Sequence, residues 1–104
     1  MKAIADANDF DAEVTKHTGV VLVDFYTDDC APCRMMKPVL DELAIEQNNF
    51  KIVKIDAAAN QNLAANFRVS AVPTFVLFSN GQVKGQFTGA RSKKHLLTWI
   101  DSNR

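Results

Sequence analysis

The chain has 104 residues, of which 47% are hydrophobic and 23% are charged, and these proportions predict one globular domain spanning residues 1–104. Twelve Lys and Arg residues balance twelve Asp and Glu residues, so no basic surface is expected to gather nucleic acid. No unbroken apolar stretch is longer than Val20–Val23, which excludes a membrane-spanning helix, and Asp6 interrupts any N-terminal signal peptide, so we expect a cytoplasmic protein. The neutral charge balance and the ordinary apolar fraction favour a monomer.

The predicted elements alternate between strands and helices, apart from one hairpin near the end. In chain order they are a short strand near Lys2–Ile4, a helix from an Asn8 cap to about His17, a strand at Val20–Tyr26, a helix from Cys30–Pro32 to about Gln47, a strand at Phe50–Ile55, a short helix at Asn60–Phe67, a hairpin of Thr74–Phe78 and Gln82–Phe87, and a helix capped by Ser92.

Three of these segments decide the fold class. Val20–Tyr26 is apolar on both faces, as central parallel strands are. The helix after it is apolar at Met36, Leu40 and Leu43, although Pro38 interrupts its hydrogen bonding and should kink it. Asn80-Gly81 between two apolar runs is a strong hairpin signal. The pattern predicts an α/β fold, with a central mixed β-sheet flanked by helices on both faces.

The two cysteines, Cys30 and Cys33, lie between a predicted strand and the helix that follows it. A disulfide between them would close too small a loop to be an effective structural staple. Unpaired N–H groups and the helix dipole favour a thiolate at the helix start, where Pro32 fits because its missing N–H has no acceptor there. We therefore expect an exposed, nucleophilic Cys30 and a partly buried Cys33.

One mechanism uses both sulfurs. The Cys30 thiolate attacks a partner's disulfide, a mixed disulfide forms, and Cys33 displaces the reduced partner. Two inert thiols at a helix start are one alternative. A zinc site is another, but it needs two more ligands, and the only imidazoles, His17 and His95, lack local ligand spacing.

Asp24 lies in the middle of the predicted buried strand. Burial of a carboxylate raises its pKa unless the group is paired, and a raised pKa suits proton exchange with Cys33. Lys54, on the neighbouring predicted strand, could hold its ammonium group near Asp24. The alternatives are an Asp24 at the strand end that points to solvent and a Lys54 on a solvated face.

Several motifs in one order resemble the thioredoxin family over essentially the whole chain. They are Val-Asp-Phe before a Cys-x-Pro-Cys, a proline five residues beyond the second cysteine, Val-Pro-Thr-Phe, Asn-Gly, and Gly-Ala-x-Ser-Lys. The resemblance implies a thioredoxin fold and a thiol–disulfide oxidoreductase that reduces disulfide-containing proteins. It also implies no bound cofactor and no metal, and electrons that come from NADPH through a thioredoxin reductase.

The resemblance also implies roles for individual residues. Cys30 would be the nucleophile and Cys33 the resolving thiol, with Asp24 and Lys54 handling the proton. The expected substrate contacts are Ala31 and Pro32 beside the cysteines, the backbone of Val72, Pro73 as the family's cis-proline, and Gly89 on the rim. Gly89 could equally be an ordinary glycine at a strand end.

The chain departs from the usual Trp-Cys-Gly-Pro-Cys of that family at two positions, Asp29 and Ala31. Ala31 stiffens the loop and so affects the redox potential, while Asp28 and Asp29 oppose thiolate formation at Cys30. Two rival functions stay open. One is an oxidant or isomerase with the same fold, and the other is a non-catalytic binding subunit that docks through the rim around Cys30.

Overall fold

A five-stranded sheet in the order β1-β3-β2-β4-β5 forms the centre of the computed structural model, which describes residues 1–104. The strands are β1 (Lys2–Ile4), β2 (Val20–Tyr26), β3 (Lys51–Asp56), β4 (Thr74–Ser79) and β5 (Gln82–Thr88). β1, β3 and β2 run parallel, β4 is antiparallel to β2, and β5 is antiparallel to β4. The predicted mixed sheet is confirmed, with the predicted Thr74–Phe87 hairpin as its antiparallel part.

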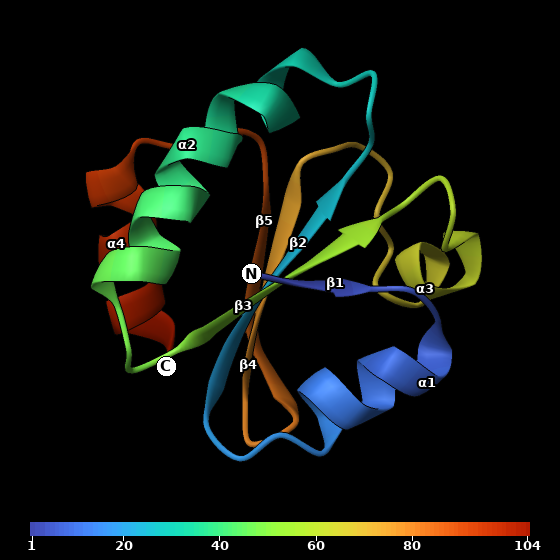
Figure 1. Cartoon of the computed structure of the whole chain (residues 1–104), viewed down its shortest axis with the longest axis horizontal. Coiled ribbons are helices and arrows are strands. Elements are labelled where there is room, and N and C mark those ends of the chain that lie inside the picture. The colour runs from blue at the N-terminus through green and yellow to red at the C-terminus, as the bar shows by residue number, and fades with distance from the viewer.

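Helices cover both faces of this sheet, as Figure 1 shows. They are α1 (Ala7–Phe10), which continues as a π-helical segment η1 (Asp11–Thr15), α2 (Ala31–Glu46), α3 (Gln61–Asn66) and α4 (Lys93–Asn103). α2 and α4 lie on one face, and α1 and α3 lie on the other. None of these helices is long and apolar enough to span a bilayer.

The side chains of β2 alternate between two separate cores. Val21, Val23 and Phe25 belong to the cluster beneath α1 and α3, whereas Leu22 belongs to the cluster beneath α2 and α4. Because successive side chains of a strand point to opposite faces, Asp24 points to the same face as Leu22, toward α2. The apolar pattern of one strand therefore delivers a carboxyl group beneath the helix that carries the cysteines.

The first helix departs from the prediction at both ends. Its N-cap is Asp6, not Asn8, because Asp6 has extended backbone and its carboxylate accepts the N–H of Asp9 at 2.9 Å. Asn8 lies inside the helix, and the helical segment ends at Thr15, two residues before His17. The carboxylate of Asp6, and not the amide of Asn8, therefore caps the helix.

The predicted cap of the last helix and the predicted hairpin turn are both confirmed. Ser92 Oγ accepts the N–H of His95 at 3.2 Å at the start of α4. Asn80 and Gly81 both have positive φ, 51° and 81°, and form the two-residue turn between β4 and β5. Paired positive φ values match the twist of the flanking strands, which is why Asn-Gly predicts such turns.

Candidate functional site

Cys30 and Cys33 form a disulfide at the junction between β2 and α2, with their Cα atoms 5.2 Å apart. Cys30 is the N-cap of α2: its backbone is extended, and its Sγ accepts the N–H of Cys33 at 3.1 Å. A sulfur thus takes the place that an Asp or Ser oxygen fills in an ordinary helix cap. Pro32 lies in the first helical turn, where a missing N–H costs no hydrogen bond. The sequence places one sulfur where helix N–H groups favour negative charge.

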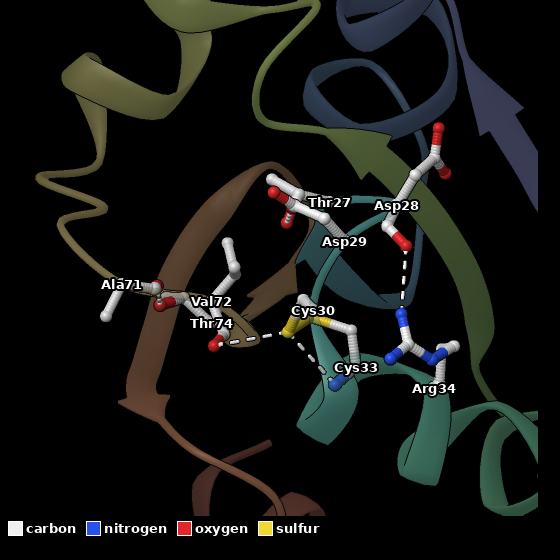
Figure 2. The surroundings of a disulfide bond; sticks show 9 residues. All are labelled: Thr27, Asp28, Asp29, Cys30, Cys33, Arg34, Ala71, Val72 and Thr74. Atoms are coloured by element: carbon white, nitrogen blue, oxygen red, sulfur yellow. Dashed lines mark hydrogen bonds between the residues drawn. A yellow bond between two sulfur atoms is a disulfide. The ribbon is translucent and has the colours of Figure 1, made fainter.

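The segment Ala71–Thr74 lies beside Cys30, as Figure 2 shows. Cys30 Sγ is 3.5 Å from the carbonyl oxygen of Val72, and the Val72–Pro73 peptide bond is cis. Two bonds hold this segment in place: Thr74 Oγ1 donates to the carbonyl of Ala71 at 2.7 Å, and the N–H of Gly89 donates to the carbonyl of Pro73 at 2.9 Å. The structure therefore brings Val72, Pro73 and Gly89 together with Cys30.

The buried Thr74 is a residue that sequence reasoning missed. Its side chain is fully enclosed, and its hydroxyl also lies 2.9 Å from that of Thr88 on the adjacent strand. A threonine at the start of a strand is not distinctive in a sequence. The role of Thr74 depends on the backbone conformation that brings the carbonyl of Ala71 within reach of its hydroxyl.

The expected order of cysteine exposure is wrong. Cys30 is buried, with 8% of its surface exposed, whereas Cys33 is half-buried. The physical reason is that Val72 packs beside Cys30 from a segment some forty residues away, while Cys33, the third residue of α2, borders a cavity. The half-buried cysteine is thus the second one, not the first.

Asp24 is buried in the middle of β2, with 7% of its surface exposed, so the alternative of a solvent-facing Asp24 is excluded. Burial raises the pKa of its carboxyl from 3.8 to about 7, and the charge of Lys54 opposes that rise. Its Oδ1 atom has no hydrogen-bond partner. Asp24 and Lys54 are paired in register across β2 and β3, and the two side chains share one face of the sheet.

Lys54 forms no ion pair with Asp24, but its positive charge lowers the pKa of Asp24 from a longer distance. Its Nζ lies 5.8 Å from the centre of the Tyr26 ring, a position typical of a cation–π contact. The lysine is half-buried, so the alternative of a fully solvated Lys54 does not hold.

A cavity of about 350 Å³ lies between α2 and the sheet on the Cys33 side of the disulfide. Its walls include Asp24 and Lys54 from the sheet and Cys33 from α2; the remaining lining residues are Met1, Tyr26, Thr27, Asp28, Arg34, Lys37 and Leu40. Cys30 is not part of the wall. The cavity thus joins the buried carboxyl group to the second cysteine.

The residues that flank the disulfide in sequence are exposed. Ala31 and Pro32 present the first turn of α2 to solvent, and Asp28 and Asp29 precede it. Thr27 Oγ1 donates to Asp29 Oδ1 at 2.9 Å, and Arg34 Nη1 donates to the carbonyl of Asp28 at 3.1 Å. The acidic loop is therefore anchored beside the site. No group of three or more His, Cys, Asp or Glu side chains is arranged to hold a metal ion.

Comparison with known proteins places these features in context. The family model for thioredoxin matches residues 1–102. A thioredoxin of Pseudomonas aeruginosa is 39% identical over 96% of this chain and 93% of its own length. A bifunctional thioredoxin reductase/thioredoxin of Mycobacterium leprae is 41% identical over 90% of this chain and 20% of its own length. The X-ray structure of Fasciola hepatica thioredoxin superposes with a TM-score of 0.91 over the whole of both chains, at 31% identity.

Proposed function

Because this chain belongs to the thioredoxin family, we propose that its Cys30 thiolate begins each exchange with a protein disulfide and that Cys33 completes it. The chain is a thiol–disulfide oxidoreductase that acts as a protein-disulfide reductase. The observation that supports different roles for the two cysteines is the hydrogen bond that the N–H of Cys33 donates to Cys30 Sγ at 3.1 Å. A bond from the first helical turn stabilises negative charge on Cys30 and makes it both the nucleophile and the better leaving group.

The proposed reaction has two steps. In the first, the Cys30 thiolate attacks one sulfur of the substrate disulfide, forms the mixed disulfide, and releases the other substrate sulfur as a thiolate. In the second, Cys33 loses its proton and attacks Cys30 Sγ, the mixed disulfide breaks, and the second substrate sulfur leaves as a thiolate. The Cys30–Cys33 disulfide of the structure is the product of that second step.

Asp24 and Lys54 are assigned to the proton of Cys33 in this proposal. A carboxyl group whose pKa lies at about 7 is divided between its two forms at neutral pH, so it can accept the proton that Cys33 loses. Asp24 and Cys33 line the same cavity, which gives the proton a path. The charge of Lys54 lowers the pKa of Asp24 and so opposes the effect of burial, which keeps part of the carboxyl group ionised.

The backbone of Val72 is assigned to the substrate. Neither its N–H nor its carbonyl is bonded to another backbone group, although it lies directly beside Cys30. An extended segment of a substrate can pair with these groups as an added strand, which places its disulfide over Cys30. Pro73 and Gly89 shape that edge, and Ala31 and Pro32 form the exposed first turn of α2 directly after Cys30.

The electron source in this proposal is NADPH, delivered by a thioredoxin reductase. The Mycobacterium leprae relative carries both activities in its name, which supports such a partner for this chain. We place the reaction in the cytoplasm, because a dithiol that must be reduced again after each turnover needs a reducing compartment. In this function residues 1–104 act as one domain, as a monomer and without a bound cofactor.

Reduction of insulin disulfides with dithiothreitol as the electron source tests this function. Wild type is expected to accelerate insulin reduction over dithiothreitol alone, and Cys30→Ser is expected to lose that acceleration entirely. A Cys30→Ser variant that still accelerates the reaction would contradict the assignment of the nucleophile. A wild-type chain without activity would contradict the mechanism as a whole.

A further inference from the structure

The loop between β5 and α4 contains one cation, Arg91, which lies at the rim of the redox site. We propose that Arg91, held in place by Met36 and Phe87, binds a carboxylate of the protein substrate near the cysteine that Cys30 attacks. The chain then prefers disulfides that have acidic residues on one side of that cysteine. The inference rests on the proposed function, because it specifies which protein disulfides the same site reduces best.

A hydrogen bond joins the start of this loop to the edge that is assigned to the substrate. The N–H of Gly89 donates to the carbonyl of Pro73 at 2.9 Å. The residue before Pro73, Val72, has its carbonyl oxygen 3.5 Å from Cys30 Sγ. Two residues span at most about 7 Å, so Arg91 lies within that distance of Gly89 along the chain. An extended substrate rises about 3.3 Å per residue, so a side chain a few positions from the substrate cysteine can reach Arg91.

A second hydrogen bond joins the loop to the helix that begins at the disulfide. The N–H of Arg91 donates to Met36 Sδ at 3.4 Å, and Met36 is buried in α2, with 2% of its surface exposed. Met36 lies three residues beyond Cys33, about 4.5 Å along the helix axis. Figure 1 shows the loop running beside α2 on its way from β5 to α4. The backbone of Arg91 is therefore fixed against the second turn of α2.

The side chain of Arg91 is fixed as well. Its guanidinium carbon lies 3.8 Å from the centre of the Phe87 ring, well within the range of a cation–π contact. Phe87 is itself held by two aromatic neighbours, Phe75 and Trp99, at 5.0 Å and 4.7 Å between ring centres. A side chain that is ordered before binding loses less conformational entropy when a ligand binds to it. Arg91 is therefore prepared for a carboxylate.

The guanidinium of Arg91 has no carboxylate partner within the chain, since no ion pair of the structure includes it. Stacking occupies one face of a planar guanidinium and leaves its in-plane N–H groups available. These groups match the two oxygens of a carboxylate. Because Arg91 is exposed, a carboxylate of another protein can reach it.

Arg91 and the acidic loop before Cys30 lie on different sides of α2. The guanidinium of Arg34 holds the loop that contains Asp28. Met36, two positions later in α2, holds the loop that contains Arg91. With about 3.6 residues per turn, these two helix positions point roughly 200° apart around the axis. The acidic loop repels an acidic substrate residue on one side, and Arg91 attracts one on the other. The position of the acid relative to the substrate cysteine therefore matters, and not only the net charge of the substrate.

The test uses disulfide-linked dimers of three short peptides, each with one cysteine. One peptide has three Glu residues directly before the cysteine, one has three Glu residues directly after it, and the reference has Gln at all six positions. The reduced protein is mixed with each dimer and quenched in acid, and the released peptide thiol is measured by chromatography. Each rate constant is divided by that of the Gln peptide with the same protein, which gives the acid preference for each of the two Glu peptides.

Wild type is expected to reduce one Glu peptide faster than the other. Arg91→Gln should lower the acid preference for that faster peptide by about twofold to fivefold, the effect of one exposed ion pair, and should change the other by less. Met36→Leu keeps the approximate volume of the side chain but removes the sulfur acceptor, so it should lower the same preference by a smaller factor. The matched control Lys84→Gln removes an exposed lysine of β5 outside the loop and should leave both preferences unchanged.

An equal effect of Arg91→Gln on the two Glu peptides would mean that its charge acts from a distance and not by contact, and would overturn the inference. The absence of any effect, or an equal effect of Lys84→Gln, would also overturn it. An unchanged preference in Met36→Leu would contradict the positioning of Arg91 by the Met36 sulfur.

The Gln peptide separates this inference from the proposed function. Reduction of the Gln peptide by wild type, combined with no effect of Arg91→Gln on the acid preference, overturns the carboxylate site alone. Failure of wild type to reduce any of the three peptides contradicts the proposed function first.

Discussion

At the scale of single residues, Asp24 has the only buried side-chain oxygen or nitrogen in the chain that lacks a hydrogen bond. Burial raises its pKa to about 7, so the folded state prefers the neutral carboxyl. In the unfolded chain the group ionises near 3.8. The stability contributed by the neutral form is therefore fully present below pH 3.8, declines as the pH rises toward 7, and is absent above it.

Replacement of Asp24 by Asn removes this titration while it keeps the shape of the side chain. The free energy of unfolding of Asp24→Asn, relative to wild type, is expected to rise by about 4 kcal/mol from pH 4 to pH 8, in proportion to the pKa difference. Urea titrations of the two oxidised proteins at a series of pH values measure it. A difference that is flat with pH would show that Asp24 is not perturbed by the fold.

Asp29 provides a residue-scale prediction about the nucleophile. Its exposed carboxylate precedes Cys30, and charge there opposes the thiolate. Asp29→Asn keeps the acceptor oxygen that Thr27 Oγ1 contacts, so it changes the charge alone. The pH midpoint for alkylation of Cys30 in the reduced protein is expected to fall by about half a unit or less, the size of a screened surface interaction.

The matched control for this experiment is Asp41→Asn, which removes an exposed carboxylate from the middle of α2. Its alkylation midpoint should equal that of wild type. An Asp29→Asn midpoint that also equals wild type would mean that solvent and Arg34 screen the acidic loop completely.

The residues of the site divide into those that the sequence could predict and those that it could not. Burial of Asp24 follows from its apolar neighbours along one strand, and the cap position of Cys30 follows from the strand-to-helix junction. The exposure of the two cysteines could not be predicted, because it is decided by Val72, which approaches from a distant part of the chain. Local pattern carries no information about such a contact.

At the scale of elements, the turn between β4 and β5 contains Gly81, whose φ is 81°. A Cβ at this position would lie 2.4 Å from the carbonyl oxygen of Thr15, which belongs to η1. Gly81→Ala is therefore expected to lose about 2 kcal/mol or more of unfolding free energy, since it adds a backbone clash to the strain of a left-handed residue.

Gly89→Ala is the matched control, because Gly89 also has positive φ, 106°, but a Cβ there would meet nothing within 4 Å. Urea unfolding of both oxidised variants separates the clash from the backbone strain. Gly81→Ala should be the less stable of the two. The opposite order would mean that η1 moves away from the turn at little cost.

Helix ends and turns were predicted correctly where the interactions that fix them act between neighbouring residues. Ser92 and Asn80-Gly81 use side-chain or backbone chemistry that acts within a few residues, and the structure confirms both. The predicted start of the first helix was wrong because Asp6 and Asn8 are both residue types that cap helices, and only the contacts of the folded chain show that Asp6 is the cap. Its π-helical continuation has no sequence signature that a period of 3.6 residues can reveal.

At the scale of the whole molecule, the two faces of the sheet carry separate cores, and the redox site draws on elements from both ends of the chain. The alternating strands and helices predicted this architecture, since a sheet with apolar strands needs helices on both faces. The cavity could not be predicted, because β2, β3, α2 and the N-terminus must be assembled before its walls exist. Its cations are ordinary surface residues in the sequence.

The single tryptophan tests this arrangement. Trp99 lies in α4 and packs edge-on against Phe87 of β5, with ring centres 4.7 Å apart. The disulfide lies at the start of α2, beside Val72, and neither hydrogen bond of Cys30 Sγ involves α4. Reduction is therefore expected to leave the intensity and wavelength of Trp99 emission unchanged. A large change on reduction would contradict the independence of α4 from the site.

The central claim is that Cys30 attacks a substrate disulfide and Cys33 resolves the intermediate, and a covalent trap with insulin tests it most directly. Reduced Cys33→Ser is incubated with insulin, quenched in acid and analysed by mass spectrometry. The account predicts a stable adduct in which Cys30 is joined to an insulin chain, with Cys30→Ser forming far less. Equal trapping by the two variants, or preferential trapping through Cys33, would contradict the claim.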